Sequence, residues 1–287
     1  MIEGQEDVGW DDWVALARAC EEHGIEALFR SDHYIGLSGE STRGALDAWG
    51  TLCGLAAITS RLRLGTLVSP ATFRHPAVLA KLAVTADHIS GGRIEVGMGA
   101  GWHEREHALF GFEFPPARER MARLEAQLQT VHEHWESGEQ QFQPVQKPHP
   151  PLIMGGSAGP KSAALAARWA DEYNTVYVLP DEAGRRRDAI AAACQAAGRE
   201  PIPLSLMNGF LIGADEAELR ERERALVAWS GSGPGETWLT GTPVRIAERL
   251  REYEAAGVQR VMLQHLLHRD LDAIALLGRE VVPAVSP

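Results

Sequence analysis

The sequence has few cysteines and no long apolar run, and both absences narrow the class of protein. Its three cysteines, Cys20, Cys53 and Cys194, lie far apart in the 287 residues, and none belongs to a CxxC pair. Three scattered thiols do not suit a disulfide framework, so we expect reduced packing residues in a cytoplasmic protein. We see no signal peptide and no run of about 18 apolar residues, and we therefore expect no membrane partner.

Basic residues are also few relative to acidic ones. The chain has 28 Lys and Arg against 39 Asp and Glu, which gives a formal net charge of −11. This acidic balance argues against nucleic acid or an anionic membrane as the main partner. An anionic cofactor remains compatible with it, because backbone amides at helix N-termini bind anions without a basic surface.

The sequence does contain a regular alternation of strand-like and helix-like segments. A strand-like run at 62–68 precedes a helical segment at 75–89, and a second strand-like run at 93–98 ends in glycine. Strand, helix and strand at this spacing predict a βαβ unit and therefore a parallel sheet. Glycines and polar residues gather where these strands end, which is where parallel sheets bind ligands.

The alternation continues along the whole chain. The predicted strands are 1–5, 25–29, 62–68, 93–98, 152–154, 173–177, 203–212 and 260–264. The predicted helices are 11–23, 46–58, 75–89, 117–135, one containing 163–169, one beginning at 181, 215–229, 242–256 and 271–281, and 230–240 is a predicted loop. Eight strands, each followed by a helix, in under 300 residues predict an α/β fold, a (β/α)8 TIM barrel that forms one domain over 1–287.

The ends of barrel strands carry the chemistry, so the residues after the second strand are candidates for a site. Asp32 and His33 occupy this position. A histidine exchanges protons near neutral pH, and an adjacent carboxylate can anchor a polar ring. An Asp-His pair that only caps the next turn is the alternative interpretation.

Two glycine-rich segments follow other strands. The segment from Gly97 to Gly101, which includes Gly99 and Ala100, allows a backbone to approach a flat or phosphorylated ligand, although the third glycine of a GxGxxG fingerprint that begins at Gly97 would fall at Trp102. Free amides at the start of the helix after 155–159, with a lysine nearby, suit a phosphate. A tight turn and an ordinary glycine-rich helix entry are the respective alternatives.

The pentapeptide from His103 to His107 matches HExxH, the signature of zinc-protease helices. In those helices both imidazoles bind zinc, and the glutamate, here Glu104, is the general base. A glycine turn precedes the pentapeptide, Phe110 and Gly111 soon interrupt any helix, and no third ligand follows at the metzincin spacing. A solvated helical turn at the barrel mouth is the preferred interpretation, with a zinc hydrolase as the alternative.

Longer blocks carry a resemblance to a known family. RSDH after the second strand, LGTLVSPATFRHPAVLAK, DHISGGRIEVGMGAGWHEREHALFG and PPLIMGGSAGPKSAALAARWADEYN resemble the bacterial-luciferase-like flavin and deazaflavin oxidoreductases. The resemblance covers essentially the whole chain and is closest to the branch that uses coenzyme F420, which includes the F420-dependent glucose-6-phosphate dehydrogenases and the methylene-tetrahydromethanopterin reductases. It implies a TIM barrel with the cofactor ring in its C-terminal mouth, a small organic substrate and, as in many relatives, a homodimer.

The resemblance also assigns roles to residues. It implies that Asp32 contacts the ring and that His33 lies near its reactive edge, both as catalytic residues, and that Leu67–Val68 corresponds to a non-prolyl cis peptide behind the ring. The remaining cofactor contacts that it implies are Gly99, Ala100 and Gly101 beside the ring, and Gly155, Gly156, Ser157, Ala158 and Gly159 around the phosphate.

The activity that this resemblance implies is hydride transfer between coenzyme F420 and the substrate. The alternatives are an FMN-dependent two-component monooxygenase of the same fold and a non-catalytic flavin-binding protein. Trp102 stands where the sugar-phosphate dehydrogenases have an acidic glutamate, which argues against sugar-phosphate oxidation by the same mechanism.

Overall fold

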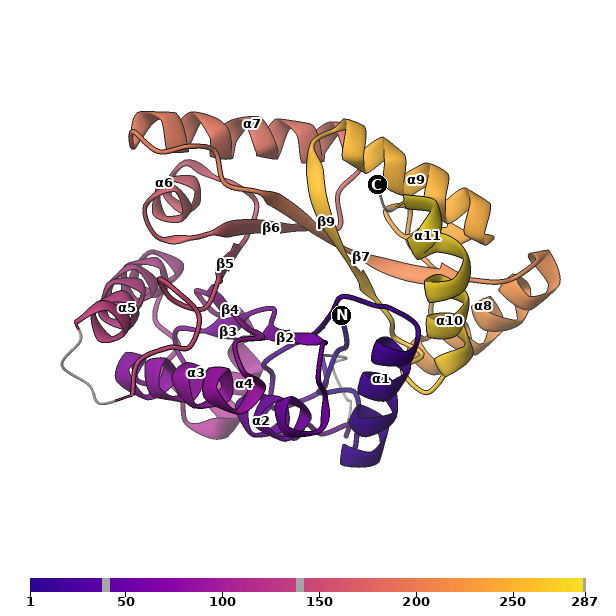
Figure 1. The fold of residues 1–287 in the computed structure, drawn as a ribbon, viewed down its shortest axis with the longest axis horizontal. Helices are drawn as coiled ribbons and strands as arrows, with labels where there is room; N and C mark the ends of the chain where they lie inside the picture. Colours follow the sequence, from indigo (N-terminus) through magenta and orange to yellow (C-terminus); the bar gives the residue numbers. More distant parts are fainter. Residues whose placement is uncertain (38–41, 138–141, 286–287) are drawn as a thin grey trace.

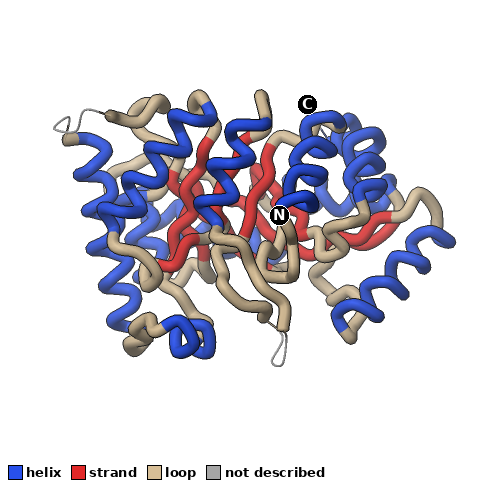
Figure 2. Tube along the Cα trace, turned by 90° about the horizontal axis from the view of Figure 1, so that it is seen from below, coloured by secondary structure: helices blue, strands red, loops and turns tan. Residues whose placement is uncertain are grey.

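Parallel strands form a ring that helices surround (Figure 1). The structure is a computed structural model that describes residues 1–37, 42–137 and 142–285. Viewed from the side, the strands run through the interior and the helices cover the outside (Figure 2). The strands are β1 (Ala27–Arg30), β2 (Arg63–Thr66), β3 (Ser69–Pro70), β4 (Ile94–Gly99), β5 (Leu152–Gly155), β6 (Glu172–Val176), β7 (Leu204–Ile212), β8 (Leu239–Gly241) and β9 (Val258–Gln264).

The order of pairing around the ring is β1, β2, β4, β5, β6, β7 and β9, and every one of these pairs is parallel. The start of the chain closes the ring: Ile2 N donates to Phe29 O at 2.9 Å, and His265 N donates to Met1 O at 3.0 Å. A cavity of about 930 Å³ lies beside this closure, between β1, β9 and the C-terminal helices. The predicted (β/α)8 barrel is confirmed.

The helices follow the strands and begin and end at residues that suit those positions. Prolines open α3, α6, α7 and α9, and Gly91 ends α3 in a left-handed conformation. The helices are α1 (Trp10–Glu22), α2 (Ala48–Ile58), α3 (Pro76–Ser90), α4 (Glu104–Phe110), α5 (Ala117–Glu136), α6 (Pro160–Trp169), α7 (Pro180–Ala196), α8 (Glu216–Ser230), α9 (Pro243–Ala255), α10 (Leu271–Leu276), the π-helical turn η1 (Leu277–Val281) and α11 (Val282–Val285). Within the described ranges, none of these helices has the length and apolar character needed to cross a bilayer.

The core has two parts, because successive side chains of a strand point to opposite faces. A large apolar cluster lies between the strands and the helices, and a smaller one, which includes Phe29, Ile153, Met207 and Met262, faces the inside of the ring. The interior also carries charge, because Glu95 on β4 contacts Arg63 on β2 and Arg260 on β9 at 2.5 Å each. These ion pairs connect strands on different sides of the ring.

The structure departs from the predicted elements in several places, of which three bear on the barrel. The predicted first strand is reduced to a single bridge between Ile2 and Arg30. The third predicted strand, 62–68, shortens to β2, and the separate strand β3 follows after the Leu67–Val68 bond, which is cis. The predicted loop at 230–240 runs into the short strand β8, which pairs with the far end of β7 where that strand leaves the ring toward α8 (Figure 1).

Candidate active site

The candidate residues lie at one end of the barrel. Ser31 to His33 follow β1, Ala100 to His103 follow β4, and Gly156 to Gly159 follow β5. Since all the strands of the ring are parallel, their carboxyl ends face the same side and bring these loops together. The predicted location of the site at the C-terminal mouth therefore matches the arrangement of the strands.

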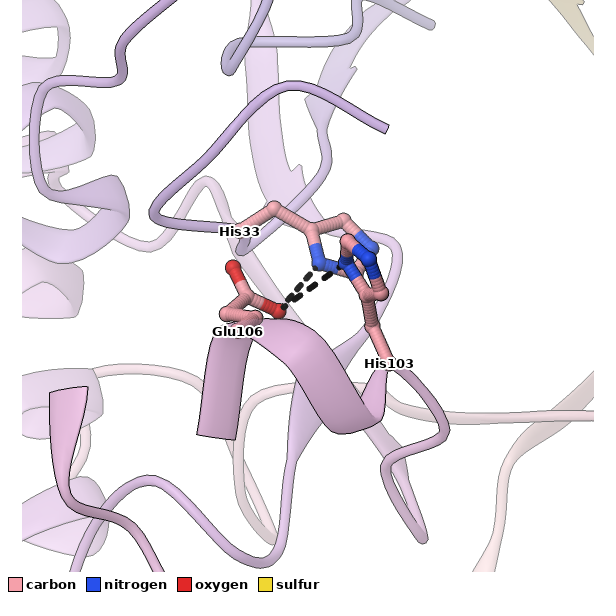
Figure 3. Close-up of side chains that lie close together, drawn as sticks. All are labelled: His33, His103 and Glu106. Carbon is pink, nitrogen blue, oxygen red and sulfur yellow. Dashed lines mark hydrogen bonds and ion pairs between the residues drawn. The ribbon is translucent and has the colours of Figure 1, made fainter. Parts of the chain in front are cut away.

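His33 pairs with a carboxylate that the sequence interpretation did not select. Its Nδ1 lies 2.8 Å from Oε2 of Glu106 on α4, and the other oxygen of Glu106 accepts from the backbone amide of Tyr34 (Figure 3). The His33 side chain is 12% exposed and that of Glu106 is fully buried. Glu106 thus fixes Nδ1 of His33, and Nε2 can bond to another partner.

The charges of this pair support each other. Burial of the imidazole opposes its protonated form, but the hydrogen bond and the negative charge of Glu106 outweigh burial and raise the pKa of His33. Burial likewise opposes the carboxylate, yet the contacts with His33 and with the Tyr34 amide lower the pKa of Glu106. The hydrogen bond thus favours the charged form of each partner over what burial alone would give.

His103 and Trp102 complete this part of the mouth. The two rings stack with their centroids 5.1 Å apart and their planes at 20°, and Trp102 also meets His33 edge-on at 5.7 Å. His103 Nδ1 is 3.9 Å from Glu106 Oε2, is buried and has no hydrogen-bond partner among the described residues. Burial lowers the pKa of His103, which favours a neutral ring.

The structure contradicts a zinc site formed by His103 and His107 of the HExxH pattern. His107 is fully buried, its Nδ1 lies 2.7 Å from His103 O, and its Nε2 lies 2.7 Å from Thr72 Oγ1, so neither ring nitrogen faces a metal. Glu106 is buried as well, so the expectation of a solvated turn is wrong for Glu106 and His107, whereas the other residues of α4 are exposed. Across the described residues, the group whose ligand atoms gather within 4.8 Å is instead His33, His103 and Glu106.

Asp32 is buried in a network of its own. Its Oδ2 accepts from Ser69 Oγ at 2.6 Å and from Arg74 Nη1 at 2.5 Å, and its Oδ1 accepts from Arg74 Nη2 at 3.1 Å. Arg74 also contacts Asp47 at 2.8 Å. An oxygen such as Oδ1 that accepts one hydrogen bond has room for another, so the predicted ring contact of Asp32 stays a prediction.

The glycines after β4 make room for the segment that contains the cis bond. A Cβ on Gly97 would lie 2.0 Å from Thr66 O, and one on Gly99 would lie 2.6 Å from Val68 Cγ2. Gly101 has a φ of +80°, and a Cβ there would lie 2.6 Å from Thr72 Oγ1. These three glycines thus permit another part of the backbone to pack closely against β4 and the loop after it. The atoms that pack there belong to residues 66–72 of this chain.

The segment from Gly155 to Gly159 enters α6 in a tightly held loop. Ala158 has a φ of +55°, its amide donates to Tyr173 Oη at 2.9 Å, and a Cβ on Gly156 would lie 2.6 Å from the same hydroxyl oxygen. Gly159, in contrast, has open space where a Cβ would be, and α6 begins without a side-chain cap. The uncapped amides of the first turn, with Lys161 beside them, are suited to an anion.

A further polar network at the mouth was absent from the sequence interpretation. Gln264, the last residue of β9, donates from Nε2 to Glu3 Oε1 at 2.5 Å and accepts from the hydroxyl of Tyr177, which follows β6. Tyr177 is held at a φ of +50°, a rare conformation for a non-glycine residue, and burial raises the pKa of its hydroxyl to about 12. No sequence signal joins these positions, because the barrel alone brings them together.

The chain is similar in sequence to several known proteins. An uncharacterized protein of Mycobacterium tuberculosis is 29% identical over 271 residues, covering 84% of this chain and 90% of the relative. The F420-dependent glucose-6-phosphate dehydrogenase of Amycolatopsis mediterranei is 33% identical over 183 residues, covering 58% of this chain and 54% of that enzyme.

Solved structures share the fold. The coenzyme F420-dependent tetrahydromethanopterin reductase of Methanopyrus kandleri superposes with a TM-score of 0.82 at 19% identity, over 100% of this chain and 98% of that one. A monooxygenase of Streptomyces bottropensis superposes with a TM-score of 0.82 at 22% identity, over 99% of each chain. Residues 2–236 match the family described as luciferase-like monooxygenase, and the chain belongs to that family.

Proposed function

We propose that this protein is a coenzyme F420-dependent oxidoreductase that transfers a hydride between the deazaflavin and a small organic substrate. The observation that carries the proposal is the His33–Glu106 pair at the mouth of a barrel whose relatives include F420-dependent dehydrogenases. A histidine held by a carboxylate is a common device for moving a proton near neutral pH.

The residues around the mouth fit such a cofactor. We assign the phosphate to the segment from Gly155 to Gly159, because α6 begins there with uncapped amides, Gly159 faces open space and Lys161 adds a positive charge. We assign the ring to the surface between the Leu67–Val68 bond, Asp32 and the loop after β4, which are the remaining predicted contacts.

The chain's own residues would position the substrate and move its proton. Bound coenzyme F420 would supply or accept the hydride. Glu106 fixes His33 through Nδ1, so Nε2 is the nitrogen that can give a proton to a substrate oxygen in reduction or take one in oxidation. Holding the substrate beside both groups would account for much of the acceleration.

Binding of the cofactor tests the proposal directly. We would titrate the purified protein with F420 and with FMN and follow the fluorescence of each ring. We expect saturable binding of F420, weakened in Lys161→Ala and unchanged in the matched control Lys81→Ala on α3. Failure to bind either ring would overturn the proposal, and equal affinity of both variants would overturn the phosphate assignment.

An FMN-dependent two-component monooxygenase is the second candidate. The description of the family and the similarity in fold to a Streptomyces monooxygenase favour it. In that reaction reduced FMN meets oxygen, so oxygen uptake with reduced FMN and no uptake with reduced F420 would replace the first candidate with this one.

We also propose that the enzyme works in the cytoplasm, and its oligomeric state can be measured. Cys20, Cys53 and Cys194 are all free thiols, which suits the reducing cytoplasm. The homodimer that the resemblance implies remains a prediction, and light scattering after size-exclusion chromatography would measure it. A mass of one chain, 31.3 kDa, would contradict the dimer.

A further inference from the structure

We propose that His33, His103 and Glu106 form a binding site for a divalent transition-metal cation of the Zn²⁺ type, and that the bound cation withdraws His33 from proton transfer. The binding part of this proposal does not depend on the reaction, whereas the inhibitory part rests on the proposed function.

The three side chains converge on one carboxylate oxygen. Glu106 Oε2 lies 2.8 Å from His33 Nδ1 and 3.9 Å from His103 Nδ1, and both contacts are visible in Figure 3. Zinc bonds of about 2.1 Å in a tetrahedral site place the ligand atoms about 3.4 Å apart. The two measured separations lie on either side of this value, so small side-chain movements would admit the ion.

The surroundings hold the ligands in place. The backbone amide of Tyr34 donates to Glu106 Oε1, which leaves Oε2 directed at the two imidazoles. Trp102 stacks on His103 and fixes the plane of that ring. Partners of this kind orient metal ligands and account for part of the affinity of natural sites.

The unpaired ring nitrogen of His103 is independent evidence for a bound ion at this site. Its Nδ1 is buried, and within the part of the chain that the structure describes it has no hydrogen-bond partner, although the carboxylate oxygen lies only 3.9 Å away. A buried ring nitrogen without a partner is energetically unfavourable, and a shared cation would satisfy it. His107, the other histidine of the HExxH pattern, has both nitrogens engaged and needs no such partner.

The donor atoms select the type of metal. Two imidazole nitrogens and one carboxylate oxygen match the His₂Glu set of catalytic zinc sites, which keep a fourth position open. Such donors favour Zn²⁺ and Co²⁺, whereas Mg²⁺ and Ca²⁺ prefer sites built from oxygen alone. We therefore expect no competition from Mg²⁺.

Metal binding has a direct consequence for His33. A cation on Nδ1 occupies the nitrogen that Glu106 now holds, and Nε2 then keeps its own proton. A ring in that state can no longer cycle between one and two protons. Zn²⁺ should therefore inhibit the enzyme reversibly, and a chelator should restore its activity.

Isothermal titration calorimetry with Zn²⁺ on chelator-treated enzyme tests binding without any substrate. We expect one Zn²⁺ per chain in the wild type, with binding about 100-fold weaker in His103→Gln and in Glu106→Gln, since even the loss of an outer partner costs 10–100-fold. The matched controls, Glu104→Gln and His107→Gln on the same helix, should bind as the wild type does. Loss of binding in His107→Gln, or wild-type affinity in His103→Gln, would overturn the assignment.

Two further measurements keep the result interpretable. Circular dichroism melts of each variant show whether Glu106→Gln still folds, and His103→Gln tests the site alone if it does not. The visible spectrum of bound Co²⁺ should appear in the wild type and disappear in His103→Gln. One Zn²⁺ bound with full activity would overturn the inhibitory role only, and the proposed function would stand.

Discussion

At the scale of single residues, the site depends on a pair that lies 73 positions apart in the chain, His33 and Glu106. His33 follows a strand, and its place at the barrel mouth could be predicted from the sequence. Glu106 could not be predicted in the same way, because the HExxH pattern assigns the functional roles to Glu104, His103 and His107. The direction of a side chain on the short helix α4 decides which glutamate faces the mouth, and it depends on the docking of that helix.

Removing the imidazole of His33 should impair catalysis more than cofactor binding. In His33→Asn we expect kcat for hydride transfer to fall by about 100-fold, the lower range of general acid–base contributions. The dissociation constant for F420 should change by only a few-fold, because no predicted phosphate contact is altered. Stopped-flow absorbance of the deazaflavin and a fluorescence titration measure the two quantities. An unchanged kcat would remove His33 from the mechanism, with His23→Asn as the control for a histidine outside the site.

At the scale of elements, the β4 glycines and the β2–β3 junction depend on each other. Gly97→Ala places a Cβ 2.0 Å from the backbone oxygen of Thr66, and Gly99→Ala places one 2.6 Å from a methyl of Val68. We expect both to lower the free energy of unfolding by about 1–3 kcal/mol or more, as in other overpacked cores, and Gly97→Ala to lose more because a backbone atom cannot rotate away.

Gly159→Ala is the matched control for these two variants. Its φ of −63° suits alanine and nothing lies within 4 Å of the added Cβ, so the change in stability should stay within about 0.5 kcal/mol. Urea denaturation followed by circular dichroism compares the three variants. If Gly97→Ala were as stable as Gly159→Ala, the junction would be more deformable than its geometry indicates.

Most elements could be predicted from the sequence because periodicity and end signals agree. Thr242 as N-cap and Pro243 in the first turn mark the start of α9, and Gly257 marks its end, within two residues of the observed places. β8 could not be predicted, since three residues are too few to show an alternating pattern and only the extended end of β7 pairs with them. The first strand shrinks to one bridge for a related reason: its role is to join β1 to β9, and that role appears only in the closed ring.

At the scale of the whole molecule, ion pairs inside the ring connect strands that are remote in sequence. Arg260 on β9 contacts both Glu95 on β4 and Glu172 on β6, and Arg63 on β2 contacts Glu95. The side chain of Glu95 is 2% exposed. Removing Glu95 takes the carboxylate partner from Arg63 and leaves Arg260 with Glu172 alone, and breaking a buried group in this way is far more destabilising than the net contribution of the group.

Glu95 and Glu172 should therefore respond differently to the same substitution. Burial opposes the carboxylate of Glu95, but its bonds with Arg260 and Arg63 outweigh burial and lower its pKa from 4.5. For Glu172, burial dominates and raises the pKa from 4.5. At pH 7 we expect Glu95→Gln to lower the free energy of unfolding by about 3–5 kcal/mol and Glu172→Gln to lower it much less, because only Glu95 gains from being charged.

The same difference in pKa determines whether each carboxylate raises or lowers the free energy of unfolding as the pH falls. A carboxylate whose pKa is lowered on folding contributes stability above its unfolded pKa, near 4.5, and loses it as pH falls through the folded value. Glu172 acts in the opposite sense: its contribution is present at low pH and is lost as pH rises through its raised folded pKa. Urea titrations from pH 7 to pH 3 should thus show a loss of stability below about pH 4.5 that is shallower in Glu95→Gln. The gain that Glu172 contributes on acidification falls above about pH 4.5, and it should be absent in Glu172→Gln. Parallel curves for the wild type and Glu95→Gln would mean that Glu95 does not connect the strands of the ring through its charge.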